Sequence, residues 1–384
     1  MKCTFMSPSS VTGKSERIEP ELTPNAMAVL RERYLRKDEE GNVTETPAEL
    51  FWRVACQAAS AERIYGATPE SEAAMRRRFY DLMAQGVFLP NSPTLMNAGR
   101  DQAMMSACYV LPVEDSIEGI FAGVSNAARV QKAGGGTGFD FSRLRPKGDR
   151  VASSGGTTSG PVSFMAVYSA ATDAIEQGAH RRGANMGGMR VDHPDIVEFI
   201  TAKKDAASLT NFNLSVAVTD DFMEALEERP DTPHRVRNPR DGSTSVLRKE
   251  DGRPWIVGEI FDLIVHNAWE TGEPGLIFID HVNAENPTPH LGDIEAVNPC
   301  GEQPLLPYES CTLGSINLGK FVKRENGFVN FDFDAFAGVI PTAVRFLDNI
   351  IDVNHYPIPE CEAMAKGNRK IGLGVMGFAD VLFA

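Results

Sequence analysis

The amino-acid pattern changes near residue 95, and this change is the strongest constraint on the fold. Before it, three Thr-Pro pairs begin at Thr23, Thr46 and Thr68, each placing a capping hydroxyl ahead of a proline, as at the start of a helix. After it, short β-like runs alternate with glycine-rich turns and helical segments. The pattern predicts an α-helical region over 1–95, followed by an α/β region over 96–384.

Hydrophobic periodicity predicts the elements of the second region. Strands are expected over 107–111, 214–218, 276–279 and 312–318, and helices over 116–131, 195–203, 220–227 and 257–271. The segment 228–254 is rich in Pro, Asp, Arg and Gly and is interpreted as an exposed excursion without a catalytic task. Cys56 lies in an amphipathic helical pattern, where no chemical role is expected.

Charge and hydropathy exclude several classes of protein. A net charge of −14 argues against a nucleic-acid polymer as partner, since such partners need a broad basic surface. Basic residues at 143–150 and 180–182 could hold a small anion or be solvated surface charge. No apolar run approaches the roughly 20 residues of a membrane span, and no signal-peptide pattern is present, so we expect a cytoplasmic chain that does not enter a membrane.

The segment 297–304 carries the most chemical information. Two prolines and a glycine exclude a regular helix, so the backbone is either extended or looped. In an extended backbone, Asn298, Cys300 and Glu302 would share one face, which would present an amide, a thiol and a carboxylate together. The alternative is a simple turn with incidental polar residues, and spacing alone does not separate the two.

Two further cysteines lie in expected strands. Cys108 and Cys311 could pack as small apolar residues, as buried cysteines often do. None of the six cysteines forms a C-x-x-C pair, which argues against a disulfide scaffold and a zinc site, and no Cys–His pairing suggests a cysteine hydrolase. The glycine-rich run 133–143 lacks a P-loop lysine and is a weak motif, although it could bring backbone N–H groups close to a nucleotide.

Several segments, taken in their order along the chain, resemble the catalytic subunit of a ribonucleotide reductase. They are Asn-Ser-Pro-Thr-Leu from Asn91, the strand with Cys108, Asn-Pro-Cys-Gly-Glu from Asn298, Ser-Cys-Thr-Leu-Gly-Ser-Ile-Asn-Leu from Ser310, and Arg-Lys-Ile-Gly-Leu-Gly from Arg369. The resemblance extends over nearly the whole chain. It implies part of a ten-stranded α/β barrel, the second half of which would lie beyond residue 384.

The resemblance implies catalytic roles for five residues. Cys300 would carry the thiyl radical that takes the ribose 3′ hydrogen, Glu302 would act as base toward the 3′ hydroxyl, and Asn298 would bind the ribose. Cys108 and Cys311 would reduce C2′ and end as a disulfide, which thioredoxin or a similar dithiol would reduce. The product would be a deoxyribonucleotide for DNA synthesis, and we expect diphosphate substrates.

The sequences around Leu22 and around Cys300 resemble those of the adenosylcobalamin-dependent class. This resemblance implies adenosylcobalamin as cofactor and no metal site formed by the protein itself. One alternative is a class I large subunit, whose radical comes from a separate metal subunit. Another is a non-catalytic fragment that binds nucleotides. The 384-residue polypeptide is expected to be inactive alone, as a fragment or as one half of an enzyme completed by a second polypeptide.

The resemblance also implies two nucleotide sites. The expected effector residues, which would bind a deoxynucleotide or ATP, are Asp115, Ser116, Arg143 and Arg145. The expected substrate residues are Ser92, Thr94, Ala107, Gly135 and Arg182. Effector sites of this kind lie at a dimer interface, so a homodimer is expected.

Overall fold

The computed structural model describes residues 18–100, 103–151, 155–176, 183–205, 207–325 and 327–384. The chain divides into two compact units. Unit 1 comprises the described residues of Met1–Met105, Leu313–Val353 and Leu373–Ala384, and unit 2 those of Ser106–Thr312 and Asn354–Gly372. Each unit is therefore assembled from segments that are distant in the sequence.

Unit 1 begins with helices, three of which start where the Thr-Pro pairs predict. The helices are α1 (Pro24–Arg33), α2 (Pro47–Ala59), the 3-10 helix η1 (Ser60–Tyr65), α3 (Pro69–Ala84) and α4 (Ser92–Asn97). The hydroxyls of Thr23, Thr46 and Thr68 accept the backbone N–H groups of Ala26, Glu49 and Ser71, each at 3.2 Å. The α-helical entry region is thus confirmed, and Cys56 lies inside α2.

The rest of unit 1 comes mainly from the later chain. It contains β1 (Phe88–Pro90), η3 (Leu318–Phe321), the hairpin β12 (Val322–Glu325) and β13 (Phe328–Phe331), α11 (Phe333–Val353) and α13 (Phe378–Phe383). The long strand β11 (Ser310–Asn317) begins in unit 2 and pairs with β1 in unit 1. Edge-to-face contacts of Phe346 with Phe79 and Phe88 fix α11 against the first helices.

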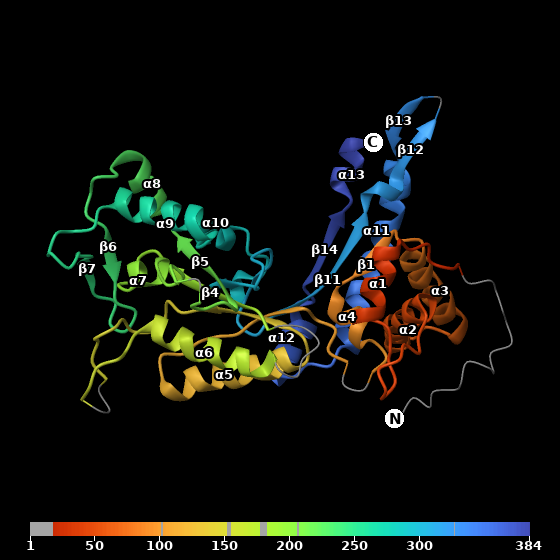
Figure 1. Cartoon of the computed structure of the whole chain (residues 1–384), viewed down its shortest axis with the longest axis horizontal. Coiled ribbons are helices and arrows are strands. Elements are labelled where there is room, and N and C mark those ends of the chain that lie inside the picture. The colour runs from red at the N-terminus through yellow and green to blue at the C-terminus, as the bar shows by residue number, and fades with distance from the viewer. Residues whose placement is uncertain (1–17, 101–102, 152–154, 177–182, 206, 326) are drawn as a thin grey trace. The chain divides into compact units, whose positions relative to one another are not determined.

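Unit 2 is built on a sheet of parallel strands. Their order is β2 (Cys108–Val110), β3 (Gly136–Asp140), β4 (Asn185–Arg190), β5 (Phe212–Val218) and β8 (Gly275–Phe278). Next to β2, β11 runs antiparallel and continues the sheet to β1. Parallel neighbours need crossover connections, and helices supply them. The crossovers contain α5 (Ile117–Lys132), α6 (Pro161–Glu176), α7 (Ile196–Ile200), α8 (Asp220–Glu228) and α9 (Val257–Thr271). In Figure 1, α5 and α6 lie along one side of this sheet, and α8 and α9 along the other.

Sequence expectations for unit 2 are confirmed with end shifts of a few residues. The predicted helix 257–271 coincides with α9, and Gly272 ends it in the left-handed conformation at φ 84°. The segment 228–254, interpreted as an exposed excursion, is largely exposed. It forms the hairpin of β6 (Arg235–Arg237) and β7 (Thr244–Val246), in which His234 and Val236 are buried because they pack back onto unit 2.

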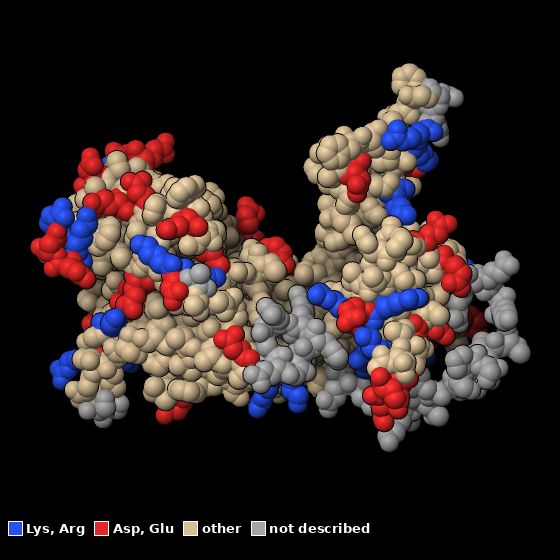
Figure 2. All heavy atoms as spheres, in the orientation of Figure 1, with Lys and Arg blue, Asp and Glu red and all other residues tan. Residues whose placement is uncertain are grey.

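The surface carries mixed charge. On the face drawn in Figure 2, Lys and Arg side chains occur in small groups among Asp and Glu, without a broad basic area. Within the described residues, no helix is both long and apolar enough to cross a membrane.

Candidate active site

Cys108 and Cys311 face each other in unit 2. They are directly opposed in the antiparallel pairing of β2 with β11, and both are buried. Their side chains form a hydrogen bond, which together with burial raises the pKa of the Cys311 thiol well above its usual value. Directly opposed residues of an antiparallel pair have a Cβ separation of about 4.5–5.5 Å, close to what a disulfide requires. These two residues, named here the cysteine pair, can therefore be oxidised with little backbone movement.

Cys300 lies at the tip of a short hairpin, named here the Cys300 hairpin. Its strands are β9 (Ala296–Val297) and β10 (Pro304–Leu305). Between them the backbone turns, since the Gly301 N–H donates to the Asn298 carbonyl at 3.0 Å and Gly301 has a φ of 83°. The segment is therefore looped, and the shared face expected of an extended backbone is not formed: Asn298 is fully buried, whereas Cys300 and Glu302 are exposed.

The Asn298 side chain joins the hairpin to the cysteine pair. Its Nδ2 donates to the Cys108 sulfur at 3.1 Å, and its Oδ1 accepts the Gln303 N–H at 2.9 Å. Asn298 is thus not an incidental turn residue. The same amide closes the Cys300 loop and contacts one thiol of the pair.

Glu302 belongs electrostatically to the same region. Its negative charge is one of the causes that raise the pKa of Cys311, after the hydrogen bond to Cys108 and burial. The described residues of unit 2 therefore bring all five predicted catalytic residues into one neighbourhood. These are Asn298, Cys300, Glu302, Cys108 and Cys311.

The glycine-rich run has a function that sequence reasoning missed. A Cβ on Gly138 would lie 1.9 Å from the Val297 carbonyl oxygen, and one on Gly136 would lie 2.6 Å from the Pro299 ring. Both glycines are in β3, so they let the Cys300 hairpin cross the sheet at backbone contact. The signal available in the sequence was a strand interrupted by alternate glycines.

Asn213 is a second residue that the sequence did not identify. It lies in β5, and its Nδ2 donates to the Pro299 carbonyl at 2.7 Å, which ties the turn of the Cys300 hairpin to the sheet. An asparagine inside a run of strand-forming residues was the only signal, because asparagine is depleted in strands. Nearby, Gln131, Thr137 and Asn185 form a buried hydrogen-bond network at the amino ends of β3 and β4.

The predicted substrate residues are placed as follows. In unit 1, the Ser92 hydroxyl is 2.7 Å from that of Tyr34, and the buried Thr94 hydroxyl donates to the Met105 carbonyl at 3.1 Å. In unit 2, Ala107 donates its N–H to the Cys311 carbonyl at 3.2 Å, and Gly135 lies in the turn before β3. Arg182 lies outside the described residues.

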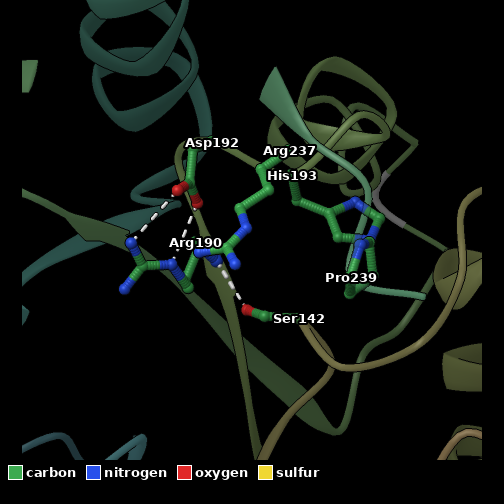
Figure 3. A pocket seen from close by; sticks show the side chains of 6 residues that line it. All are labelled: Ser142, Arg190, Asp192, His193, Arg237 and Pro239. Atoms are coloured by element: carbon green, nitrogen blue, oxygen red, sulfur yellow. Dashed lines mark hydrogen bonds and ion pairs between the residues drawn. The ribbon is translucent and has the colours of Figure 1, made fainter. Parts of the chain in front are cut away.

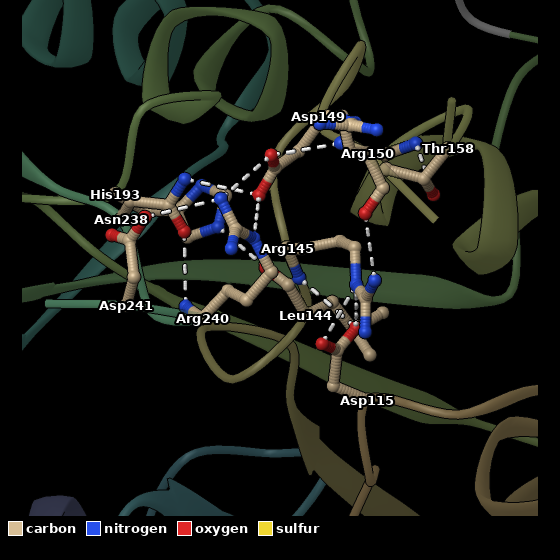
Figure 4. A network of polar contacts seen from close by, with 11 residues as sticks. Asp115, Leu144, Arg145, Asp149, Arg150, Thr158, His193, Asn238, Arg240 and Asp241 are labelled. Carbon is tan, nitrogen blue, oxygen red and sulfur yellow. Dashed lines mark hydrogen bonds and ion pairs between the residues drawn. The ribbon is translucent and has the colours of Figure 1, made fainter. Parts of the chain in front are cut away.

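Three of the predicted effector residues, Asp115, Ser116 and Arg145, lie where α5 begins, and Figure 4 shows Asp115 with Arg145. Ser116 caps α5 by accepting the Gly119 N–H at 3.0 Å. Next to it, Arg145 pairs with Asp115 at 2.9 Å. Arg143 extends in another direction, to Glu295 at 2.7 Å. The Arg145 guanidinium thus lies beside the N-terminus of α5, an arrangement that suits phosphate.

A separate cavity of about 320 Å³ lies at the carboxyl ends of β3 and β4 (Figure 3). It is lined by Ser142, Arg190, Asp192, His193, Arg237 and Pro239. Arg190 pairs with Asp192 at 2.9 Å, and Ser142 bonds to the buried Asp140, whose pKa is raised to about 7 by burial. None of the predicted catalytic residues lines this cavity, since Cys108 lies at the amino end of β2.

Among the residues that the structure describes, no group of three or more His, Cys, Asp or Glu side chains is placed to hold a metal ion. The site offers three thiols, the Glu302 carboxylate and the Asn298 amide.

A buried pair of opposed thiols, contacted by a loop that presents a third thiol, defines a candidate site for cysteine redox chemistry on an α/β sheet. Two family models match the chain: the ribonucleotide reductase all-alpha domain over residues 20–103 and the ribonucleotide reductase barrel domain over residues 106–384. The chain belongs to the ribonucleotide reductase family.

Curated relatives agree with this assignment. The chain is 50% identical over 369 residues to the vitamin B12-dependent ribonucleoside-diphosphate reductase of Mycobacterium tuberculosis (strain CDC 1551 / Oshkosh), covering 96% of this chain and 51% of the relative. It is 45% identical to the protein of that name from Thermoplasma acidophilum, over 94% of this chain and 52% of the relative. The ribonucleoside-diphosphate reductase large chain of Schizosaccharomyces pombe is 30% identical, over 90% and 44%. The chain spans about half the length of these relatives.

Proposed function

We propose that this chain carries the radical and redox cysteines of an adenosylcobalamin-dependent ribonucleotide reductase that converts ribonucleoside diphosphates to deoxyribonucleotides. One observation carries the proposal: Asn298, on the hairpin that presents Cys300, donates a hydrogen bond to one thiol of a directly opposed cysteine pair. The names of the relatives supply the class, since the two most similar proteins described above are vitamin B12-dependent reductases.

The cysteine pair supplies the two electrons of the reaction. The C2′–OH bond of the ribonucleotide breaks, a C2′–H bond forms and the hydroxyl leaves as water, while two S–H bonds become one S–S bond between Cys108 and Cys311. The raised pKa of the Cys311 thiol keeps it protonated near neutral pH, so that it has a hydrogen to give. An external dithiol of the thioredoxin type then reduces the disulfide.

Cys300 is placed for a different role. Its exposure on the hairpin tip leaves the sulfur accessible to a radical initiator, and bound adenosylcobalamin supplies that initiating chemistry. Glu302, two residues later, would take the proton of the ribose 3′ hydroxyl, and Asn298 would orient the ribose. The rigid anchoring of the turn by Asn213 suits a radical site, because the reacting sulfur must stay in place.

Nucleotide recognition completes the proposal. The effector phosphates would bind Arg143 and Arg145, with Asp115 and Ser116 beside them. The substrate would contact Ser92, Thr94, Ala107, Gly135 and Arg182. A homodimer, a cytoplasmic location, a second polypeptide that completes the enzyme and the division of the chain near residue 95 remain predictions.

The test is an assay of CDP reduction with a dithiol, with and without adenosylcobalamin. It uses this chain joined to the C-terminal region of the Mycobacterium tuberculosis relative, because the chain spans about half of that protein. Activity only with the cobalamin is expected, and the unjoined chain should be inactive. Activity that needs a metal subunit instead would favour a class I large subunit, and dTTP binding without turnover would favour a nucleotide-binding fragment.

A further inference from the structure

A buried ion pair lies next to the cysteine pair and has no part in the proposed chemistry. The Lys370 Nζ is 2.5 Å from the Glu309 Oε2, and their side chains are only 14% and 1% exposed. Asn368 donates to the other Glu309 oxygen at 2.5 Å, and the Leu306 N–H donates to Oε2 at 2.7 Å. Both oxygens of this carboxylate are thus engaged, as a buried charge requires.

The pair ties two segments that are distant in the sequence. Glu309 directly precedes β11, and its backbone carbonyl accepts the Val110 N–H at 3.1 Å, so it extends the ladder that places Cys311 opposite Cys108. Lys370 lies between α12 (Pro359–Asn368) and β14 (Ile371–Met376). The ion pair therefore fastens the start of β11 to a segment outside the β2–β11 ladder.

The backbone on both sides of this ion pair is strained. Among the described residues, only three besides glycine have a positive φ, and two of them directly precede the partners: Tyr308 at 67° and Arg369 at 53°. Left-handed backbone is unfavourable for side chains with a Cβ and persists only where surrounding contacts impose it. The contacts around Glu309 and Lys370 therefore offset the unfavourable conformational free energy of the left-handed backbone at Tyr308 and Arg369.

We propose that Glu309 and Lys370 are positioning residues for the redox step, which fix the register and place of Cys311 opposite Cys108. The inference rests on the proposed function of the cysteine pair. Glu309 does not touch the substrate; it acts through the first residues of β11. Loss of either charge frees this end of the strand and lowers the effective concentration of one thiol at the other.

The experiment measures the disulfide equilibrium of the full chain. The chain is equilibrated with mixtures of reduced and oxidised dithiothreitol, trapped with acid, alkylated and mapped by mass spectrometry. Two S–H bonds of the pair are exchanged for one S–S bond, and dithiothreitol disulfide takes up the two electrons and two protons. The variants are Glu309→Gln and Lys370→Met, with Arg53→Met as a matched control, because the Arg53–Glu45 pair in unit 1 is also buried, at 2.7 Å.

Glu309→Gln and Lys370→Met should each lower the equilibrium constant for forming the Cys108–Cys311 disulfide at least about fivefold, which is about 20 mV for a two-electron couple. Arg53→Met should leave this constant unchanged. If a single variant does not fold, the double variant Glu309→Gln/Lys370→Met, which leaves no unpaired buried charge, takes its place. A smaller change in the folded variants overturns the inference but leaves the proposed function intact. Failure of the parent chain to form this disulfide overturns both.

Discussion

The Nδ2 atom of Asn298 lies 3.1 Å from the Cys108 sulfur, and this contact links the Cys300 hairpin to the first residue of β2. The same side chain accepts the Gln303 N–H at 2.9 Å. One buried amide therefore holds the loop that presents the third thiol and fixes that loop against the cysteine pair. The arrangement explains why asparagine stands here, since the contact needs a donor and the loop needs an acceptor.

Asn298→Ala should loosen both connections. It leaves the Gln303 N–H without its acceptor, which should cost about 1–3 kcal/mol of unfolding free energy in urea titrations. The thiol of Cys108 should also react faster with iodoacetamide. Asn283→Ala is the control, because the half-buried Asn283 amide likewise both donates and accepts: it donates to the Ile279 and Ile294 carbonyls at 3.1 and 2.8 Å and accepts the Ile294 N–H at 2.8 Å. Equal Cys108 reactivity in the two variants would contradict the role of Asn298.

Gly138→Ala should displace the Cys300 hairpin. The new Cβ would lie 1.9 Å from the Val297 carbonyl oxygen, and neither partner is a flexible side chain. We expect a loss of stability of about 1–3 kcal/mol from overpacking, measured by urea unfolding. Gly338→Ala, in α11 with open space around the position, should be neutral or stabilising. A Gly138→Ala chain as stable as the parent would show that the hairpin does not cross β3 at backbone contact.

Asp140 should make stability depend on pH. Burial raises its pKa from 3.8 to about 7. Because the folded chain keeps this proton while the unfolded chain releases it, stability should fall as pH rises from about 4 to about 7, by roughly 4 kcal/mol for this shift, and then level off. Asp140→Asn should remove that slope, as followed by urea unfolding between pH 5 and 8. A slope equal to that of the parent would show that Asp140 is not the responsible group.

Arg145→Gln should weaken effector binding. The guanidinium lies beside the N-terminus of α5, where a phosphate would be held by charge-assisted hydrogen bonds, and losing one should weaken dTTP binding about tenfold or more. Calorimetric titration measures this change. Arg253→Gln, which removes a more exposed arginine paired with Asp251 at 2.7 Å, is the control. If both variants bind dTTP as the parent does, the effector site lies elsewhere.

Local signals predicted the local structure. Thr23, Thr46 and Thr68 cap helices because each hydroxyl accepts a backbone N–H of the first helical turn. This interaction is local, so it does not depend on where the helix packs in the fold. Periodicity likewise predicted β2, β5, β8, β11 and α9, whereas the glycine-rich β3 and β4 were not predicted. The five catalytic residues came from family resemblance, and the structure brings them into one neighbourhood of unit 2.

Contacts between distant segments could not be predicted. Glu309 and Lys370 are separated by 61 residues, and the local sequence around either residue does not predict that the two form an ion pair. The role of Gly136 and Gly138 depends on a hairpin that lies more than 150 residues later in the printed sequence. Spacing alone left an extended and a looped backbone open around Asn298, because the reversal at Gly301 depends on contacts that hold the hairpin, such as the bond from Asn213.

The most direct test of the central claim is a single turnover without external reductant. The pre-reduced chain is joined to the C-terminal region of the Mycobacterium tuberculosis relative, with the cysteines of that region replaced by serine so that they cannot re-reduce the pair. It is mixed with CDP and adenosylcobalamin, and both dCDP and cysteine disulfides are quantified by mass spectrometry. We predict equal amounts of dCDP and of the Cys108–Cys311 disulfide, and neither product from Cys300→Ser. Formation of dCDP without that disulfide, or undiminished turnover by Cys300→Ser, would contradict the account.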